Sequence, residues 1–257
     1  MFSVTSYKSI PSWDNAFPDK IVKLSFSSIN TSWNSFFVDI LNNTDINKID
    51  KALSAQLEKS SKIYPYPSLI FNAFVYTNYT DLKCVIIGQD PYFNSKNGVP
   101  EAMGLSFSLP YGQPIPSSLN NIYKNMLKYK IITKMPSHGN LQFWAYQGVL
   151  LLNTSLTVTD NQQNGHSNIW AEFTNRIIEK ISEESTNVIF VLWGSSASKK
   201  INIIDTTKHK VIISSHPSGL SCDKPLGVYP SFANNDHFGQ INKYLKEVNK
   251  KPIVWGL

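Results

Sequence analysis

Short runs of apolar residues alternate with helix-like segments through most of the chain. Four runs are rich in Val, Ile and Leu and contain no polar alternation: 84–87, 149–152, 188–192 and 211–213. Such runs are typical of central strands in a parallel sheet that is covered on both faces. Apolar residues at helical spacing follow the first three runs, over 118–129, 169–181 and 196–203. The pattern predicts a single α/β domain: a central four-stranded, mainly parallel sheet with helices on both faces.

The beginning of the chain follows a different pattern. Residues 1–30 are polar and mixed, which predicts an irregular N-terminal arm before a domain over 31–257. Helix-like apolar spacing then covers 33–41 and 49–57, with a break at 42–47. The N-terminus has no apolar core with a small-residue cleavage site, and no apolar run is long enough to cross a membrane. We therefore expect an intracellular protein that is not secreted.

Each predicted strand leads into a distinctive polar segment. The four segments read GQDPY at 88–92, NTSL at 153–156, WGS at 193–195 and HPSGLS at 216–221. In open α/β sheets, ligands bind beyond the carboxyl ends of the strands. The sequence therefore predicts one site, built from all four segments, at that edge of the sheet.

The charge of the chain gives weak evidence for a polyanionic partner. Its net charge is +6, which also suits a soluble protein that is merely basic. The basic residues are nearly all lysines, and Arg176 is the single arginine. Bidentate reading of guanine edges by arginine is therefore not expected. Phosphate contacts would come from lysines, hydroxyls and backbone N–H groups.

The cysteines and histidines do not indicate a metal or a cofactor. Cys84 and Cys222 are too few for a structural zinc site or a four-cysteine cluster. One disulfide is arithmetically possible, but Cys84 lies in an apolar run, which favours a buried free thiol. The histidines show no metal-ligand spacing, so we expect neither metal nor cofactor. A nucleotide-binding protein is excluded as well, because the glycine-rich phosphate-binding motifs are absent from the sequence.

Taken together, the polar segments resemble the family 1 uracil-DNA glycosylases, although each alone suits a turn, a strand end or a core position. The matching segments are GQDPY at 88–92 (water-activating loop), QPIPSSL at 113–119 (proline-rich loop), LLLNTSLTV at 150–158 (uracil-recognition strand), LWGS at 192–195 (Gly-Ser loop) and HPSGLS at 216–221 (leucine intercalation loop). Supporting matches include IYP at 63–65 and KPIVW at 251–255. The resemblance extends in order from Trp33 to Trp255 and leaves residues 1–30 outside.

The resemblance implies an activity and two catalytic residues. The family flips deoxyuridine out of DNA and hydrolyses its N-glycosidic bond, which releases uracil and leaves an abasic site for base excision repair. By motif position, Asp90 would activate the attacking water and favour the cationic sugar. His216 would donate a hydrogen bond to uracil O2, where negative charge collects.

The resemblance also assigns a uracil pocket and a DNA-binding surface. Asn153 would read the uracil edge, Tyr92 would exclude the thymine methyl group, Phe107 would stack on the base, and Gln89 would line the pocket. The expected DNA contacts are Pro116, Ser118, Ser195, Ser218 and the wedge residue Leu220.

Two positions depart from the family pattern. Phe93 replaces a common histidine, and Gly219 replaces a common proline. They leave open an alternative: a DNA-binding accessory protein of a replication complex that uses the same fold. The expected partner is uracil-containing DNA, either single- or double-stranded. We expect the protein to bind it as a monomer and not to associate with a membrane. Replication proteins, or a protein inhibitor that mimics DNA, are further partners that the resemblance implies.

Overall fold

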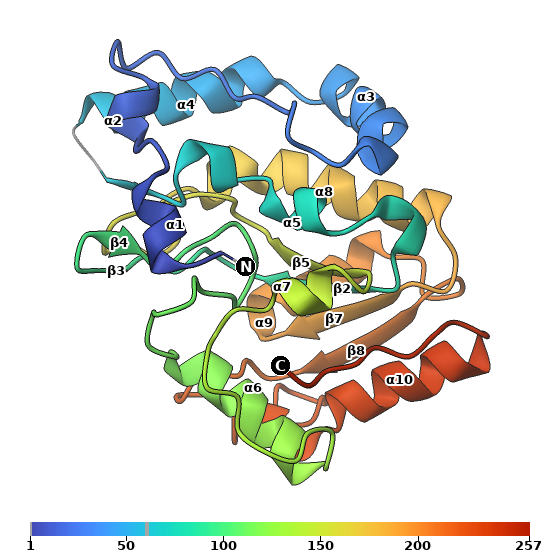
Figure 1. The fold of residues 1–257 in the computed structure, drawn as a ribbon. Helices are drawn as coiled ribbons and strands as arrows, with labels where there is room; N and C mark the ends of the chain where they lie inside the picture. Colours follow the sequence, from blue (N-terminus) through green and yellow to red (C-terminus); the bar gives the residue numbers. More distant parts are fainter. Residues whose placement is uncertain (1, 60–61) are drawn as a thin grey trace.

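A four-stranded parallel sheet forms the centre of the computed structural model, which describes residues 2–59 and 62–257 (Figure 1). In spatial order its strands are β5 (Val149–Asn153), β2 (Cys84–Gly88), β7 (Ile189–Trp193) and β8 (Lys210–Ser214). Every neighbouring pair is parallel. Residues of β2, β5 and β7 are all buried, because helices cover both faces. The predicted sheet is therefore confirmed, with each strand extending one residue beyond the carboxyl end of its apolar run.

The strand order creates one point at which the connections reverse direction. The chain passes from β2 to β5 on one side, and then returns across β2 to reach β7 and β8 on the other. The carboxyl ends of the two central neighbours are in register, since Gly88 pairs with Asn153. Ligand sites of open α/β sheets lie in the crevice at such a reversal.

Helices cover the sheet in two groups (Figure 1). One face carries α3 (Asn34–Asn42), α4 (Ile46–Glu58), α5 (Asn72–Tyr76) and α8 (Ser167–Glu184). The other carries α6 (Ser117–Lys128) and α10 (His237–Glu247). The predicted helices at 33–41, 49–57, 118–129 and 169–181 are confirmed as α3, α4, α6 and α8. The one predicted at 196–203 is divided into a single α-helical turn, α9 (Ser195–Ser198), and the 3-10 helix η4 (Lys199–Ile203).

Several short elements were not predicted. Two short antiparallel pairs join β1 (Ile63–Tyr64) to β6 (Val158–Thr159), and β3 (Ser95–Lys96) to β4 (Val99–Pro100). After residue 30, the other short elements are α7 (Gln142–Ala145) and the 3-10 helices η1 (Thr31–Trp33), η2 (Pro67–Leu69), η3 (Tyr79–Asp81) and η5 (Phe232–Asn234). Elements of two to four residues are too short to show a period in the sequence.

The N-terminal residues differ from the irregular arm that the sequence suggested. They contain two short helices, α1 (Val4–Lys8) and α2 (Trp13–Ala16). Tyr7 and Trp13 are buried. The Tyr7 hydroxyl donates to the Ala102 carbonyl at 2.9 Å, and the Trp13 indole N–H donates to the Pro65 carbonyl at 2.9 Å. Two aromatic anchors therefore attach this segment to the body of the protein.

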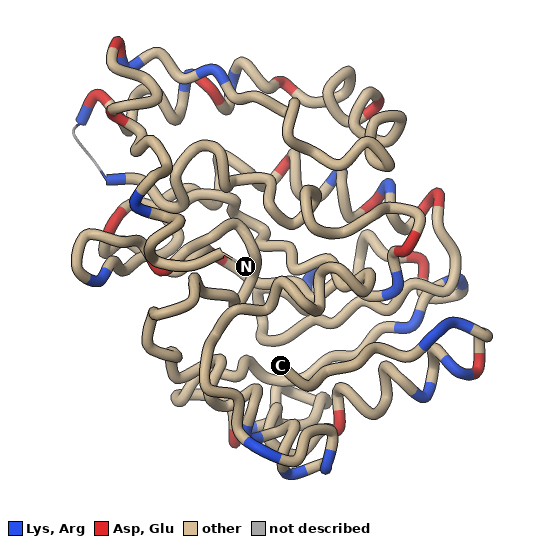
Figure 2. Tube along the Cα trace, viewed as in Figure 1, with Lys and Arg blue, Asp and Glu red and all other residues tan. Residues whose placement is uncertain are grey.

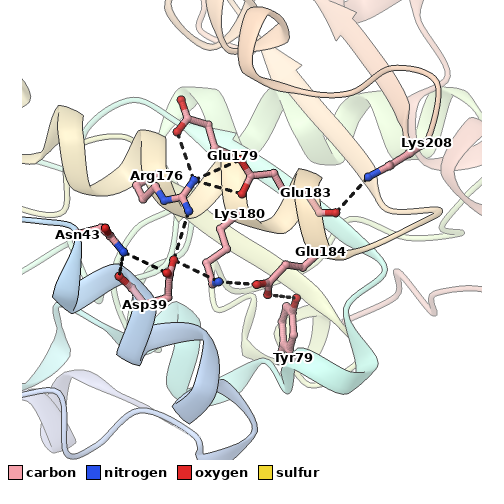
Figure 3. Close-up of polar contacts among 9 residues, drawn as sticks. All are labelled: Asp39, Asn43, Tyr79, Arg176, Glu179, Lys180, Glu183, Glu184 and Lys208. Carbon is pink, nitrogen blue, oxygen red and sulfur yellow. Dashed lines mark hydrogen bonds and ion pairs between the residues drawn. The ribbon is translucent and has the colours of Figure 1, made fainter.

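The single arginine belongs to an ion-pair cluster between α3 and α8 (Figure 3). Arg176 lies 3.3 Å from Asp39 and 3.2 Å from Glu183. Lys180 lies 3.2 Å from the same Asp39 carboxylate and also pairs with Glu184. The only guanidinium of the chain is thus engaged with carboxylates on the surface of the helical layer.

Other sequence-based expectations concern the thiols and the membrane. Cys84 is a buried free thiol, as expected, and Cys222 is also free and buried. Over residues 2–59 and 62–257, none of the helices combines the length and apolar character needed to span a membrane. The charges are unevenly distributed: Figure 2 shows lysines following one another along α6 and α10.

Candidate active site

A cleft of about 470 Å³ opens at the carboxyl ends of the central strands. It brings together all the predicted site residues except Ser195, which lies exposed at the start of α9. The members of the cleft that the sequence predicted are Gln89, Asp90, Tyr92, Phe107, Pro116, Ser118, Asn153, His216, Ser218 and Leu220. Residues more than a hundred positions apart thus meet because their segments follow neighbouring parallel strands.

One oxygen of the Asp90 carboxylate accepts a hydrogen bond within the protein, and the other accepts none from the described residues. Its Oδ2 accepts a hydrogen bond from the backbone N–H of Asn164 at 2.9 Å. Its Oδ1 is buried and has no hydrogen-bond partner among the described residues. Burial raises the pKa of Asp90, and the Asn164 bond opposes that rise. A buried oxygen without a partner costs free energy, so this atom is poised to accept a hydrogen bond from a ligand.

Asn164 is a neighbour of the candidate site that the sequence reasoning missed. Its φ of 61° places it in the left-handed region, which asparagine tolerates better than most residues. Its side-chain Oδ1 accepts a hydrogen bond from the Gln89 amide, so Asn164 contacts both Gln89 and Asp90. The dipeptide Asn164-Gly165 predicts a turn in the sequence. It does not predict that the turn contacts the distant Asp90 carboxylate.

Gly88 leaves the space that the Asn153 amide occupies. Asn153 is 7 % exposed at the end of β5, beside Gly88 at the end of β2. A Cβ at position 88 would lie 2.2 Å from the Asn153 Oδ1 and 2.8 Å from the Ser106 Cβ. The glycine therefore lets an amide with both donor and acceptor groups lie directly beside the segment that carries Asp90.

Phe107 lies in the cleft with an unusual backbone. Its φ is 61°, in the left-handed region, which is rare for an aromatic residue and costs backbone strain. Its ring centroid lies 5.4 Å from that of Trp193 and 5.9 Å from that of His216. The Tyr92 hydroxyl donates to the Phe107 carbonyl at 3.3 Å. Three aromatic groups of the cleft are thereby fixed relative to one another.

His216 is held as a neutral ring with a defined proton. Burial lowers the pKa of His216 to about 4. Its Nδ1 accepts from the Ser218 backbone N–H at 3.1 Å, so the neutral ring carries its proton on Nε2. Gly194, with a φ of +93°, makes room for this ring: a Cβ there would lie 2.9 Å from the His216 Cβ. The site thus offers an oriented, uncharged donor.

The segment after His216 exposes one apolar side chain. Ser221 donates from Oγ to the His216 carbonyl at 3.0 Å, and its Oγ lies 2.8 Å from that of Ser218. These contacts close a tight turn around Leu220, a residue that is 87 % exposed. Gly219 has open space where a Cβ would lie. An exposed leucine side chain at the edge of a cleft can insert into a bound macromolecule.

Phe93, one of the two departures from the family pattern, is partly buried and lines the cleft. It packs against Tyr64, Ala102 and Val158. Its carbonyl accepts from the Asn161 N–H at 2.9 Å. The phenyl ring therefore braces the loop after Asp90 through apolar contacts.

The comparisons with known proteins identify the family. The model of the uracil DNA glycosylase superfamily matches residues 74–246. The probable uracil-DNA glycosylase of Acanthamoeba polyphaga mimivirus is 40% identical over 258 residues, covering 96% of this chain and 70% of that protein. The uracil-DNA glycosylase of Francisella philomiragia is 44% identical over 227 residues, covering 88% of this chain and 100% of its own length. This chain belongs to the uracil-DNA glycosylase superfamily.

Solved structures agree with this family. The mimivirus uracil-DNA glycosylase superposes with a TM-score of 0.91 at 39% identity and covers 99% of both chains. A variant of the mimivirus protein, solved in complex with UGI, gives a TM-score of 0.94 at 40% identity over 100% of this chain and 98% of that one. A protein of Nitratifractor salsuginis, at 15% identity and a TM-score of 0.54, shares the fold.

Membership of the superfamily establishes the reaction. The chain is a DNA glycosylase that hydrolyses the N-glycosidic bond of uracil in DNA, the first step of base excision repair. Among the described residues, no group of three or more His, Cys, Asp and Glu side chains could hold a metal ion.

Proposed function

We propose that the cleft hydrolyses deoxyuridine after the nucleotide has been flipped out of DNA, with Asp90 activating the water. The bond cannot be reached inside the duplex, so the base must leave the stack. The observation that supports this proposal is the Asp90 carboxylate itself. Oδ2 is anchored on Asn164, while the buried Oδ1 has no partner among the described residues and can accept from a water molecule. The ionised carboxylate also stabilises the developing positive charge of the sugar.

His216 stabilises the leaving uracil in this proposal. As the bond breaks, negative charge collects on the base, including O2. A neutral imidazole with its proton on Nε2 donates to that oxygen without any change of protonation state. One oriented donor of this type is typically worth about 10² to 10³ in rate. The contact between His216 Nδ1 and the Ser218 N–H supports this tautomer.

Asn153, Tyr92, Phe107 and Gln89 select the base. The Asn153 amide accepts from uracil N3–H and donates to O4, whereas cytosine presents the opposite pattern. Tyr92 occupies the space beside C5 and excludes the methyl group of thymine. Phe107 stacks on the base, a contact worth about 1–3 kcal/mol in other base–aromatic pairs. Gln89 contributes to the pocket wall and is tied to Asn164.

Hydroxyls and an apolar wedge bind the DNA. Ser118 and Ser218, which line the cleft, and the exposed Ser195 contact phosphates, with Pro116 shaping the wall at the start of α6. Leu220 fills the gap that the flipped base leaves, which offsets part of the cost of unstacking. The engagement of Arg176 with Asp39 and Glu183 supports a DNA grip that uses no arginine.

The departures at Phe93 and Gly219 leave the catalytic groups in place. An accessory role without catalysis drew its support from these two positions. Phe93 packs in an apolar cluster, and Gly219 lies in the turn that exposes Leu220. Neither displaces Asp90, Asn153 or His216 from the cleft.

The same proposal covers the partners and the place of action. All the proposed contacts come from one chain, which supports action as a monomer on single- or double-stranded DNA. A protein inhibitor that mimics DNA would occupy the same cleft, and replication proteins would bring the enzyme to newly made DNA. The chain would then act in the nucleus or the cytoplasm, wherever its DNA is replicated.

The excision assay tests the proposed site directly. A labelled oligonucleotide with one uracil should be cut at that position after alkali treatment, in single- and double-stranded form and without added metal. The Asp90→Asn variant should bind the same DNA but lose about 10²- to 10⁴-fold in turnover, the range typical of acid–base groups. If the folded wild-type protein left uracil in place, the function would be wrong. If the variant kept full turnover, Asp90 would lose its role.

A further inference from the structure

Carboxyl groups supply the charged side chains that line the cleft among the described residues. Among the described residues, its charged lining residues are Asp90 and Glu101, and no lysine or arginine lines it. Phosphates of a DNA strand would pass close to both carboxylates. Given the proposed function, on which this inference rests, a cation near the cleft must offset this charge.

A small hairpin emerges directly from the catalytic loop. β3 and β4 pair antiparallel, with Lys96 opposite Val99. The two turn residues, Asn97 and Gly98, have φ values of 51° and 73°, as the tightest hairpin turns require. Asn94 and Glu101, at the base of the hairpin, both line the cleft, and the Glu101 N–H donates to the Asn94 carbonyl at 3.0 Å. The hairpin therefore stands on the cleft wall.

The hairpin is fixed to its surroundings on both sides. Val99 is 3 % exposed, and its carbonyl accepts from the Gln113 amide at 2.9 Å. Gln113 belongs to the proline-rich segment that leads to Ser118. On the other side, Phe93 is tied to Asn161. Figure 1 places the hairpin beside α1, at the same end of the sheet as the start of α6. Its turn is thus held in place relative to the cleft.

One cation stands on this fixed hairpin. Lys96 is exposed, next to the turn. Lys96 lies opposite Val99, two residues before Glu101, which lines the cleft. Burial raises the pKa of Glu101, while the hydrogen bond with Asn94 and the positive charge of Lys96 lower it. A lysine ammonium binds phosphate as a point charge and tolerates varied geometry, which suits contact with a backbone of any sequence.

We propose that the β3–β4 hairpin is a DNA-binding element, and that Lys96 binds a backbone phosphate next to the flipped deoxyuridine. Lys96 supplies the positive charge that the lining lacks, on the wall that carries Asp90. It acts on DNA binding and has no part in the chemical step.

The test compares Lys96→Ala with a matched control, Lys251→Ala. Lys251 is exposed beside Lys83, at the amino end of β2 and far from the cleft. Uracil excision from a single-stranded oligonucleotide is measured from about 20 to 200 mM salt. Because each phosphate contact contributes about 0.7 to the salt slope, Lys96→Ala should lower the slope by about 0.7 and raise KM about fivefold near 0.1 M salt. The kcat value and the inhibition by free uracil should not change, and Lys96→Arg should restore KM.

The outcomes separate this inference from the proposed function. Wild-type excision together with an unchanged KM and salt slope in Lys96→Ala would overturn the hairpin contact and leave the glycosylase assignment standing. A loss confined to kcat would also overturn it, because a phosphate contact that takes no part in the chemical step acts on binding. An equal change of KM and salt slope in Lys251→Ala would show that the lower net charge of the protein explains the effect, and it would overturn the hairpin contact as well. Absence of wild-type excision would instead count against the proposed function.

Discussion

At the scale of the residue, two glycines leave space for the larger side chains of the site. Gly88 makes space for the Asn153 amide, and Gly194 makes space for the His216 ring. Phe107 keeps a left-handed backbone and accepts a hydrogen bond from Tyr92. The aromatic side chains of the pocket are thus held rigidly, which a steric selection against one methyl group requires.

Tyr92 provides a test of that steric selection. Replacing Tyr92 by Ala removes the ring beside the proposed position of uracil C5, so thymine should enter and be released. One methyl group in a tight pocket corresponds to roughly 10- to 200-fold discrimination, and a loss of that order is expected. Release of thymine from a thymine-containing oligonucleotide is the measurement. The exposed Tyr146→Ala is the matched control, and strict uracil specificity in Tyr92→Ala would refute the steric explanation.

At the scale of the element, loops from distant parts of the chain support one another. The segment before α8 anchors Asp90 through Asn164. Gln113 ties the β3–β4 hairpin to the segment before α6. α1 supports the same region, since Tyr7 contacts Ala102 shortly after that hairpin. α1 therefore helps to hold the chain directly after Glu101, which lines the cleft.

Tyr7→Phe tests whether the N-terminal segment is integral to the domain. The buried Tyr7 hydroxyl donates to the Ala102 carbonyl and accepts from the Tyr66 N–H at 3.3 Å. Its removal leaves two backbone groups without this partner, which should lower the free energy of unfolding by about 1–3 kcal/mol. Urea denaturation measures the change, with Tyr146→Phe as the exposed control. Unchanged stability would indicate that the segment is only loosely attached.

At the scale of the whole molecule, charged side chains lie on the surface helices, and three histidines lie in the interior. The ion pairs of Figure 3 join α3 to α8 in the helical layer, while several lysines lie along α6 and α10. Three histidines lie inside the protein as neutral rings. Burial lowers the pKa of His166 and His216 to about 4 and that of His237 to about 3. Thr157 and Thr159 hold the two nitrogens of His166.

These histidines predict a loss of stability in acid. Their pKa values are about 6.5 in the unfolded chain and near 3–4 in the folded one, so between these values the unfolded state binds more protons. The free energy of unfolding should therefore fall as the pH drops below about 6.5, by up to about 1.4 kcal/mol per pH unit for each histidine. Urea denaturation at about pH 7 and pH 5 measures the fall, and His166→Gln should show a shallower dependence. Equal stability at the two pH values would contradict the burial of neutral rings.

The sequence alone determined the sheet and most of the cleft. Runs of Val, Ile and Leu without polar alternation require burial on both faces, and only a central parallel strand between helices provides this for four short runs in succession. Parallel strands deliver the residues that follow them to one edge. For this reason the sequence was enough to place Asp90, Asn153 and His216 together, and the motifs around them indicated the family.

Only the tertiary structure decided how these residues are held. The contact of Asn164 with Asp90, the anchoring of Tyr7 and the hairpin that carries Lys96 each join segments whose local sequence shows no periodicity. Ser195 matched its motif, yet it stands outside the cleft lining. Local patterns report which residues are buried and how the backbone repeats. A hydrogen bond between residues 74 positions apart depends on the path of the whole chain, which no single segment encodes.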